Sequence, residues 1–298
     1  MCERAVIAPV TKEAIQAAFE ARGLSPLHRF GQNFLIRPDV LDRIVAAAEL
    51  RPDEVVLEVG PGTGGLTERL LAACRRVVAA EIDRGLADHL RDLFADDSRF
   101  ELIVGDVMMK KSALEPDVVQ AVMNAGGADG PWCVVANLPY QISSPFLSAL
   151  GSGPAPPRRI VATLQKEVGI VLNAGPGDED YTPLSFLARL VWDVERLMVL
   201  SPSSFWPAPK VDSVVMRLDT RPERPTSLAA TIALGRRLFQ GRRKALRSTV
   251  ARATGVSAEQ ATAWLEAAGL SPTDRIDGVD PEAIARVAAL AHPVEDRW

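Results

Sequence analysis

Cysteine and histidine are scarce in this chain of 298 residues, with three of each. Cys2, Cys74 and Cys133 lie far apart with no CxxC spacing, and the histidines are equally scattered. Such spacing is typical neither of a disulfide framework nor of a zinc site. We therefore expect buried or reduced thiols in a cytoplasmic protein, and no metal centre.

Long hydrophobic runs are missing too. No apolar run reaches the ~18 residues that a membrane-spanning helix needs. The first residues, Met1 to Arg4, include an acidic side chain and lead into no apolar signal core. The sequence thus predicts neither membrane association nor secretion.

An excess of positive charge is also absent, because 34 basic and 38 acidic residues give a net charge of −4 at pH 7. This balance argues against a protein that coats nucleic acid indiscriminately. It does not exclude a local basic surface, since a phosphate responds to charges within a Debye length of ~8–10 Å. With 47% apolar and 24% charged residues, the composition is that of an ordinary globular protein.

Strand and helix patterns alternate through the middle of the chain. Short buried runs are separated by amphipathic segments, a rhythm that predicts parallel βαβ units in a doubly wound sheet. The expected strands are Val55–Val59, Val77–Ile82, Glu101–Val104, Trp132–Ala136 and Ile160–Leu164. The expected helices are Gly65–Arg75, Arg84–Phe94, a segment after Ser143, and Glu167–Asn173.

The pattern changes near residue 193. The strand-like runs Val194–Leu200 and Val211–Leu218 are joined by a proline-rich connection that is too short for a crossover helix, so they should pair antiparallel. A mostly parallel sheet that ends in an antiparallel hairpin predicts the α/β, Rossmann-like fold of class I methyltransferases. The helices that should follow Arg221, as a small all-α domain, are Leu228–Phe239, Arg242–Ala253, Ala258–Ala268 and Glu282–Ala291.

The segment Glu58–Gly65 follows an expected strand and opens an expected helix. Glycines there let the backbone approach a ligand closely, and the amides at a helix start can face polar ligand atoms. The spacing of Gly60, Gly62 and Gly64 is tighter than the GxGxxG of dinucleotide-binding enzymes. The segment therefore predicts a ligand loop, with a turn that serves only strand–helix packing as the alternative.

Acidic residues stand at the ends of the next two expected strands. Glu81 could accept both hydroxyls of a ribose in charge-assisted hydrogen bonds, and Asp83 is the competing candidate. Asp106 could accept a hydrogen bond from an adenine amino group, and a helix cap is its structural alternative. The two positions together predict a nucleoside site without identifying the nucleoside.

The tetrapeptide Asn137–Tyr140 stands at the carboxyl end of the fourth strand, where ligands of open α/β sheets bind. The Asn137 side-chain oxygen and the Leu138 carbonyl could hold both hydrogens of an adenine amine and stabilise the positive charge that develops on its nitrogen. Tyr140 offers a ring face to the base. The pattern favours methyl transfer to that nitrogen, which needs in-line positioning and no metal. A plain Asn-x-Pro turn is the alternative.

With these features in order, the chain resembles the ribosomal RNA adenine dimethyltransferase family (KsgA type). That family also includes the 23S RNA erythromycin-resistance methylases and mitochondrial transcription factor B. The resemblance runs from about Phe30 to Ser248, with a looser helical tail. Besides the glycine-rich segment, it rests on Arg29–Leu35, Asn137–Ser143, Leu164–Val168, Pro207–Ser213 and Arg242–Lys244.

The pattern change and the resemblance divide the chain into an N-terminal extension (1–27), an S-adenosylmethionine-binding methyltransferase domain (28–221) and a helical RNA-binding domain (222–298). The resemblance implies that Tyr140 and Phe205 stack on opposite faces of the target base, with a core phenylalanine as the alternative for Phe205. The residues that it implies for binding the cofactor S-adenosyl-L-methionine are Asn33, Leu35, Gly60, Gly62, Glu81, Asp106 and Asn137.

The implied activity is N6-dimethylation of two adjacent adenosines in the 3′-terminal hairpin of small-subunit rRNA, linked to ribosome biogenesis. The implied partner is that rRNA in a pre-ribosomal, 30S-type particle, and we expect the enzyme to be a monomer. The chain departs from the family pattern at Tyr181–Ser185 and at Lys244–Ser248. These departures put the details of RNA docking in question more than the chemistry.

Six basic residues and no acidic one occupy the twelve positions from Arg236 to Arg247. A solvated helix face normally mixes charges of both signs. The run therefore predicts a phosphate-binding surface, with a merely soluble helix face as the alternative. The expected RNA-binding residues are Arg242, Arg243, Lys244 and Arg247, with Arg158, Arg159, Lys166 and Lys210 as additions to the same surface.

Three other functions stay open. An erythromycin-resistance methylase would perform the same chemistry on large-subunit RNA, but such enzymes usually carry Ile where this chain has Leu138. A ribosome-assembly or transcription factor that acts mainly by binding would not need the intact Glu81 and Asn137–Tyr140. A nicotinamide dehydrogenase is not supported by any catalytic His or Tyr-x-x-x-Lys constellation.

Overall fold

The computed structural model describes residues 8–110, 113–127, 130–153 and 155–291. Cys2, with its predicted reduced thiol, and the outer ends of the predicted N- and C-terminal parts lie outside these residues. The chain forms two compact units. The first contains residues 1–150, 155–169 and 195–219, and the second contains 151–154, 170–194 and 220–298. The second unit thus includes residues 170–194 together with the predicted C-terminal domain.

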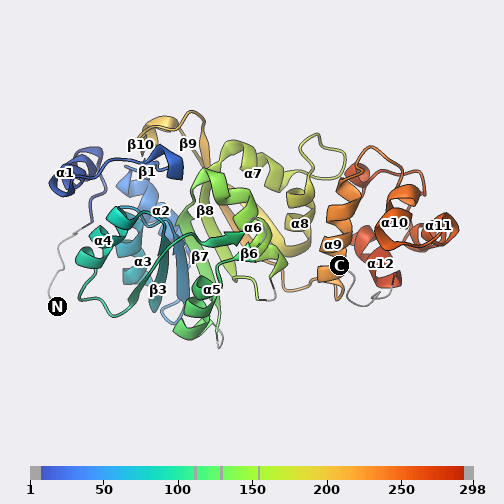
Figure 1. Cartoon of the computed structure of the whole chain (residues 1–298), viewed down its shortest axis with the longest axis horizontal. Helices are drawn as coiled ribbons and strands as arrows, with labels where there is room; N and C mark the ends of the chain where they lie inside the picture. Colours follow the sequence, from blue (N-terminus) through green and yellow to red (C-terminus); the bar gives the residue numbers. More distant parts are fainter. Residues whose placement is uncertain (1–7, 111–112, 128–129, 154, 292–298) are drawn as a thin grey trace. The chain divides into compact units, whose positions relative to one another are not determined.

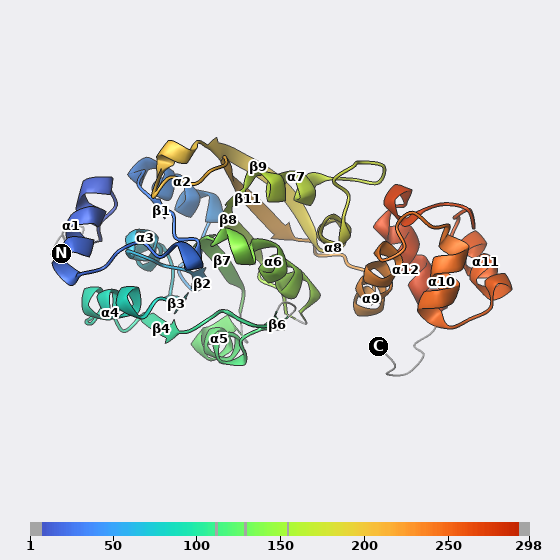
Figure 2. The same ribbon diagram turned by 45° about the horizontal axis from the view of Figure 1, so that its top comes forward.

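One mostly parallel sheet forms the body of the first unit (Figures 1 and 2). Its strands are β2 Val55–Val59, β3 Arg76–Glu81, β4 Phe100–Val104, β7 Trp132–Asn137, β8 Arg159–Gln165, β9 Trp192–Leu200 and β11 Ser213–Thr220. They are ordered β4-β3-β2-β7-β8-β11-β9. The first five in this order run parallel, whereas β11 pairs antiparallel with β8 and borders β9. The predicted Rossmann-like fold of class I methyltransferases is confirmed.

Strand β2 lies in the middle of the core. All five of its residues are buried, which requires a covering layer on both faces of the sheet. On one face, helices α2 (Pro38–Ala48) and α3 (Gly65–Ala73) pack together and share a hydrophobic cluster with β2, β3 and β7. Helix α5 (Pro116–Val122) contacts β2 and β3 from the opposite face.

The order of the strands creates a switch point beside β2. From β2 the chain proceeds outward to β3 and β4, and it then returns to place β7 on the other side of β2. Ligands of open α/β sheets bind at such a point, beyond the carboxyl ends of the strands. The glycine-rich segment after β2 and Asn137 at the end of β7 both lie there.

No helix among residues 8–110, 113–127, 130–153 and 155–291 is long and apolar enough to cross a membrane.

Apart from the helices of the second unit, the remaining elements are short. The further helices are α1 Lys12–Arg22, α4 Arg84–Leu93, α6 Ser143–Ser152 and α7 Lys166–Asn173, and the further strands are β1 Phe34–Leu35, β5 Met108–Lys110, β6 Ala113–Leu114 and β10 Phe205–Trp206. Single turns are η1 His28–Phe30, η2 Met123–Gly127, η3 Tyr140–Ile142, η4 Pro202–Ser204 and η5 Ile276–Gly278.

The second unit is helical. Its helices are α8 Pro183–Val191, α9 Leu228–Phe239, α10 Leu246–Thr254, α11 Ala258–Ala267 and α12 Pro281–Leu290. Helix α9 packs against α8, α10 and α12. The ring of Phe239 meets those of Tyr181 and Phe186 edge-on, with centroids 5.6 and 5.9 Å apart. The four helices that the sequence predicts after Arg221 are all present.

The predicted helix Arg242–Ala253 is wrong at its start, because α10 begins at Leu246 and residues 241–245 form turns. The backbone amides of Leu246 and Arg247 donate to carbonyl oxygens of the loop 272–274 at 2.7 and 3.0 Å. A loop that is distant in the sequence therefore satisfies the first amides of the helix. A local pattern cannot reveal such a start.

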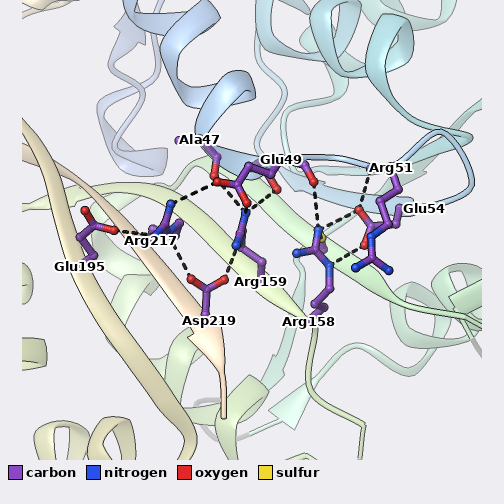
Figure 3. Close-up of polar contacts among 11 residues, drawn as sticks. Ala47, Glu49, Arg51, Glu54, Arg158, Arg159, Glu195, Arg217 and Asp219 are labelled. Atoms are coloured by element: carbon purple, nitrogen blue, oxygen red, sulfur yellow. Dashed lines mark hydrogen bonds and ion pairs between the residues drawn. The ribbon is translucent and has the colours of Figure 1, made fainter. Parts of the chain in front are cut away.

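Ion pairs join β8, β9, β11 and Glu49, the residue that follows α2, at the end of the sheet where β8 begins (Figure 3). Arg159, the first residue of β8, pairs with both Glu49 and Asp219. Arg217 of β11 bridges Asp219 and Glu195, at 3.1 and 2.8 Å. The network therefore ties together segments that are far apart in the sequence.

The predicted contribution of Arg158 and Arg159 to an RNA-binding surface is wrong. Both residues lie where β8 begins, whereas ligands bind beyond the carboxyl ends of the strands. In addition, carboxylates pair with both guanidinium groups (Figure 3). Lys166 and Lys210 are exposed, although Lys166 lies 3.4 Å from the Asp212 carboxylate.

The pair between Arg158 and Glu54 is the most buried of the ion pairs at this end of the sheet. The Glu54 side chain is 0% exposed and accepts from Arg158 at 2.6 and 2.9 Å. Burial acts to raise the pKa of Glu54, but the bonds from Arg158 and from the Arg51 amide outweigh it and lower that pKa. Glu54 is therefore a buried carboxylate that depends on its partners to stay charged.

Replacing Arg158 with Ala should lower the free energy of unfolding by about 3 kcal/mol, because the buried Glu54 carboxylate loses its guanidinium. Urea denaturation at neutral pH measures the change. The matched control is Arg37→Ala, which removes a pair with Asp39 whose side chains are 53% and 56% exposed, and should have no measurable effect. Equal stability of the two variants would contradict the interpretation.

Candidate functional site

A cavity of about 300 Å³ opens at the carboxyl ends of β2, β3, β4 and β7. The segment before β1 and the turn after β7 complete its walls. The fold thus brings residues from five separate segments of the chain to one place. The predicted site residues that line the cavity are Asn33, Gly60, Gly62, Glu81, Asp106, Asn137, Leu138 and Tyr140.

The glycine-rich segment needs its glycines for two reasons. Gly60, Gly62 and Gly64 have φ angles of 67°, 60° and 84°, a region that other residues rarely adopt. A Cβ on Gly62 would come within 3.0 Å of the Phe34 ring, and one on Gly64 within 2.9 Å of Leu93. Gly64 serves packing, whereas Gly60 and Gly62 line the cavity, so the loop combines both predicted roles.

Glu81 is fixed in the cavity wall. Its two carboxylate oxygens accept hydrogen bonds from the backbone amides of Gly62, at 3.1 Å, and Asp83, at 2.9 Å. The residue is only 4% exposed, and burial raises the pKa of its carboxyl to about 7. A rigid carboxylate shielded from water can form strong hydrogen bonds to a pair of ligand hydroxyls.

The two other acidic candidates differ in position. Asp83 caps α4 by accepting from the Gly85 amide at 2.9 Å, and it accepts from the Gln32 side chain at 2.8 Å. It is not among the described residues that line the cavity. Asp106 does line it, and a bond of 2.9 Å from the Met108 amide to one of its oxygens orients the side chain. The geometry therefore favours Glu81 over Asp83.

The Asn137–Tyr140 turn is held by contacts on both sides. The Asn137 amide nitrogen donates to the Asn33 carbonyl at 2.9 Å, so the amide oxygen is the atom that can accept from a substrate. The Tyr140 hydroxyl bonds to the Ser213 hydroxyl, and burial raises the pKa of Tyr140. Leu138 is 1% exposed, which anchors the turn that carries its carbonyl.

Glu58, within the glycine-rich segment, is a second buried carboxylate beside this site. It is 1% exposed and accepts from the Thr67 hydroxyl at 2.6 Å. Burial raises the pKa of Glu58 to about 8, against the lowering effect of Thr67, and the Glu81 carboxylate adds to the rise. Glu58 is not among the predicted site residues. An acidic residue inside an otherwise apolar strand is the signal that could have found it.

Leu35 and Phe205 do not line this cavity. They face each other in the β1–β10 pair and belong to the same hydrophobic cluster, 7% and 3% exposed. Phe205 therefore packs as a core phenylalanine, which corrects the prediction that its ring stacks on a base. Leu35 lines a smaller adjoining cavity of about 40 Å³ together with Asn137 and Glu58.

Several residues of the main cavity are not among the predicted site residues. Ile82 and Val107 each follow one of the strand-end acids and line the cavity, and Ile82 is 40% exposed. Apolar side chains at these positions suit a flat ring between them. Arg29 and Phe30 also line the cavity, with the guanidinium 4.8 Å from the ring centroid. An apolar residue directly after each acid is a usable sequence signal.

The basic residues predicted to bind RNA lie in the second unit in two different states. Arg242 lies 3.7 Å from the Asp277 carboxylate, while Arg243, Lys244 and Arg247 are exposed. The three exposed side chains stand before and in the first turn of α10. They are the members of the predicted group that can reach a phosphate without breaking an internal pair.

Two of the three cysteines lie in the part of the chain that the structure describes. Cys74 and Cys133 are buried free thiols, and burial raises their pKa values to about 12 and about 11. This confirms buried thiols at both positions. Within the described ranges, no group of three or more His, Cys, Asp or Glu residues is arranged to hold a metal ion.

The free energy of unfolding should fall as the pH rises from about 4.5 to about 8. Glu58 keeps its proton in the folded state to about pH 8, whereas the unfolded chain releases it near 4.5, so folding binds a proton in this range. Glu58→Gln should remove the slope between about pH 7 and pH 8 and halve it below about pH 7, where Glu81 also keeps a proton on folding. Urea denaturation across pH is the measurement, and the exposed Glu13→Gln is the control. An unchanged profile in Glu58→Gln would contradict the assignment.

Solved structures of methyltransferases share this fold over most of the chain. A dimethyladenosine transferase from Plasmodium falciparum matches with a TM-score of 0.69 and 25% identity, over 84% of this chain and 94% of that one. The 23S rRNA methyltransferase ErmE matches with a TM-score of 0.61 and 27% identity, over 86% of this chain and 98% of that one.

Sequence comparisons agree. A ribosomal RNA small subunit methyltransferase A from Geobacter metallireducens is 41% identical over 85% of this chain and 90% of its own length. The protein of the same name from Synechococcus elongatus is 39% identical over 84% and 89%. The family model for ribosomal RNA adenine dimethylase matches residues 26–292. The chain belongs to the ribosomal RNA adenine dimethylase family.

Proposed function

We propose that this protein transfers methyl groups from S-adenosyl-L-methionine to the N6 atoms of two adjacent adenosines in the 3′-terminal hairpin of small-subunit rRNA. The observation that carries the proposal is the single cavity that unites the glycine loop, Glu81, Asp106 and the Asn137–Tyr140 turn. A nucleoside site and an acceptor for an amine thus stand side by side at the switch point of the sheet.

The residues present fit S-adenosylmethionine. Gly60 and Gly62 line the cavity with bare backbone, in a conformation that other residues rarely adopt, and the rigid Glu81 carboxylate suits the two hydroxyls of a ribose. Asp106, with Ile82 beside Glu81, suits the amino group and the flat ring of an adenine. Asn33 and Asn137 would bound the methionine side. The bound cofactor supplies an electrophilic methyl group.

The chain's own contribution to the chemistry is to orient and polarise the target amine. The Asn137 side-chain oxygen and the Leu138 carbonyl would accept its two hydrogens, which favours a more tetrahedral nitrogen with a directed lone pair. Their dipoles would also stabilise the positive charge that grows on this nitrogen. Tyr140 would stack on the base, and its bond to Ser213 fixes the ring in advance.

Recognition of the RNA would rest on phosphate contacts in the second unit. Arg236, Arg243, Lys244 and Arg247 are exposed members of the basic run, and the last three stand together at the start of α10, in an otherwise acidic protein. Positive charges concentrated in one place attract a phosphate backbone regardless of net charge. The target adenosine would be flipped out of its stack to reach the cavity.

The proposal includes a cytoplasmic monomer that acts on a pre-ribosomal particle. A large-subunit target, as in ErmE, is the second candidate, because that structure covers 86% of this chain. The small subunit is favoured because relatives at 41% and 39% identity carry small-subunit names and because Leu138 stands where erythromycin-resistance enzymes usually carry Ile.

Asn137→Ala should lower the turnover number by roughly 10²–10³, because one preorganised acceptor is removed from the transition state. Affinity for the cofactor and for RNA should change much less. Single-turnover methylation of small-subunit particles, with N6-dimethyladenosine counted by mass spectrometry, gives the rate. Full turnover in the variant would refute the role of Asn137, and methyl groups found only on large-subunit RNA would refute the target.

Replacing Arg243, Lys244 and Arg247 together with Ala should weaken binding to small-subunit particles without changing which adenosine is methylated. If all three contact phosphates, the slope of log affinity against log salt should fall by about 2–3. Affinities measured across a salt series give this slope, and turnover at saturating RNA should survive.

A matched control for this variant removes the same charge elsewhere. Lys12, Arg43 and Arg196 are exposed in the first unit, and their triple replacement with Ala should leave the salt slope unchanged. Equal slopes for wild type and the Arg243, Lys244 and Arg247 variant would place the RNA contacts on another surface.

A further inference from the structure

Helix α1 buries two of its side chains and exposes most of the others. Thr11 begins the helix by accepting a hydrogen bond from the Ala14 amide at 3.2 Å. Ile15 and Phe19, one turn apart on the same face, are 0% and 5% exposed. Neither lines the cavity, so the role of α1 depends on what this face covers.

The buried face of α1 covers part of the cavity wall. Ile15 and Phe19 form one hydrophobic cluster with Phe34 and Leu86. Phe34 and Leu86 both line the cavity on their other side. Only one layer of side chains therefore separates α1 from the space proposed for the cofactor.

Three rings, Phe19, Phe34 and Trp206, form the centre of this cluster and are called the aromatic triad here. Phe19 meets Phe34 and Trp206 edge-on, with centroids 5.3 and 5.7 Å apart, and Phe34 lies 6.4 Å from Trp206. Trp206 is also the partner of Phe34 in the β1–β10 pair. The Phe34 ring also leaves only 3.0 Å for a Cβ on Gly62. Phe34 thus packs against both its partners in the triad and the glycine loop.

The chain on either side of α1 is fastened to the same site. The Thr63 hydroxyl donates to the Pro9 carbonyl at 3.0 Å, which attaches the segment before α1 to the glycine loop. After α1, the Gln32 side chain accepts from the Leu27 amide at 2.7 Å and donates to Asp83 at 2.8 Å. The segment 9–32 is therefore attached at both of its ends, to the glycine loop through Pro9 and to Asp83 through Gln32.

We propose that Phe19 is a positioning residue for the cofactor site, which holds Phe34 in the aromatic triad and thereby fixes the adjoining Asn33, whose carbonyl accepts from Asn137, in the cavity wall. This inference rests on the proposed S-adenosylmethionine site. Phe19 touches no reacting atom and acts through Phe34. A wall segment that is ordered before binding loses less conformational entropy when the ligand arrives, so the affinity is higher.

The test measures affinity for S-adenosylhomocysteine by calorimetry, together with thermal stability. Phe19→Ala should raise Kd by about tenfold, since it removes two ring contacts that hold the segment. Phe19→Leu, which keeps apolar volume and is the variant expected to fold most readily, should raise Kd by about two- to threefold. With the cofactor at saturation, the turnover number should fall much less than the affinity does, because Phe19 lies outside the cavity and touches no reacting atom.

The second unit supplies a matched control. Phe239 is 9% exposed and meets two other rings edge-on, like Phe19, but it lies outside the unit that contains the cavity. Phe239→Ala should lower the melting temperature as Phe19→Ala does, while Kd stays within about twofold. Glu81→Ala should also weaken binding of S-adenosylhomocysteine, because it removes the proposed partner of the ribose hydroxyls. This variant checks that the calorimetry measures binding in the cavity.

The outcomes separate this inference from the function on which it rests. An unchanged Kd in both Phe19 variants, with tight binding by wild type, would overturn the positioning role alone. An equal rise in Phe239→Ala would overturn it as well, because a general loss of stability would then explain the effect. Failure of wild type to bind S-adenosylhomocysteine or S-adenosylmethionine would overturn both proposals.

Discussion

The parallel pairing of β2 with β7 is the constraint on which the site depends. These two strands lie side by side although more than seventy residues separate them, and their carboxyl ends hold the glycine loop and Asn137 next to each other. Both strands are buried almost throughout, so their register is fixed by covering layers on both faces. Every other part of the cavity is added around this pair: Glu81 from β3, Asp106 from β4, and Asn33 from the segment before β1.

Two buried carboxyl groups, Glu58 and Glu81, lie close to this pair of strands. Burial disfavours the charged form of both, and the fold compensates Glu81 with more hydrogen bonds than Glu58. Both oxygens of Glu81 accept hydrogen bonds from backbone amides, whereas a single bond from the Thr67 hydroxyl serves Glu58. Glu81 is therefore the easier of the two to ionise, as its lower pKa indicates. Under the proposed function, a bound ligand would meet Glu81, the more readily ionised of the two acids, in the wall, with Glu58 behind it.

Much of this arrangement was accessible from sequence because it follows from local pattern and one rule of topology. Buried strands that alternate with helices predict the parallel sheet, and residues at strand ends then predict Gly60, Glu81, Asp106 and Asn137 as neighbours. The errors come from contacts that no local pattern encodes. Arg158 and Arg159 read as free basic residues, but distant carboxylates hold them. Phe205 reads as a stacking ring because it adjoins a family motif, yet pairing with β1 turns it into the core.

The chain order of the first unit has a consequence for how the protein is made. The sheet is interrupted in sequence by residues 170–194, which belong to the second unit, and β11 is inserted between β8 and β9 only after both have been synthesised. During translation, β8 must therefore wait with one edge unpaired until residues 213–220 emerge, when Arg159 also gains Asp219. An unpaired strand edge is prone to wrong pairing. Truncated chains that end before β11 should accordingly depend on chaperones, whereas the complete chain closes its own edge.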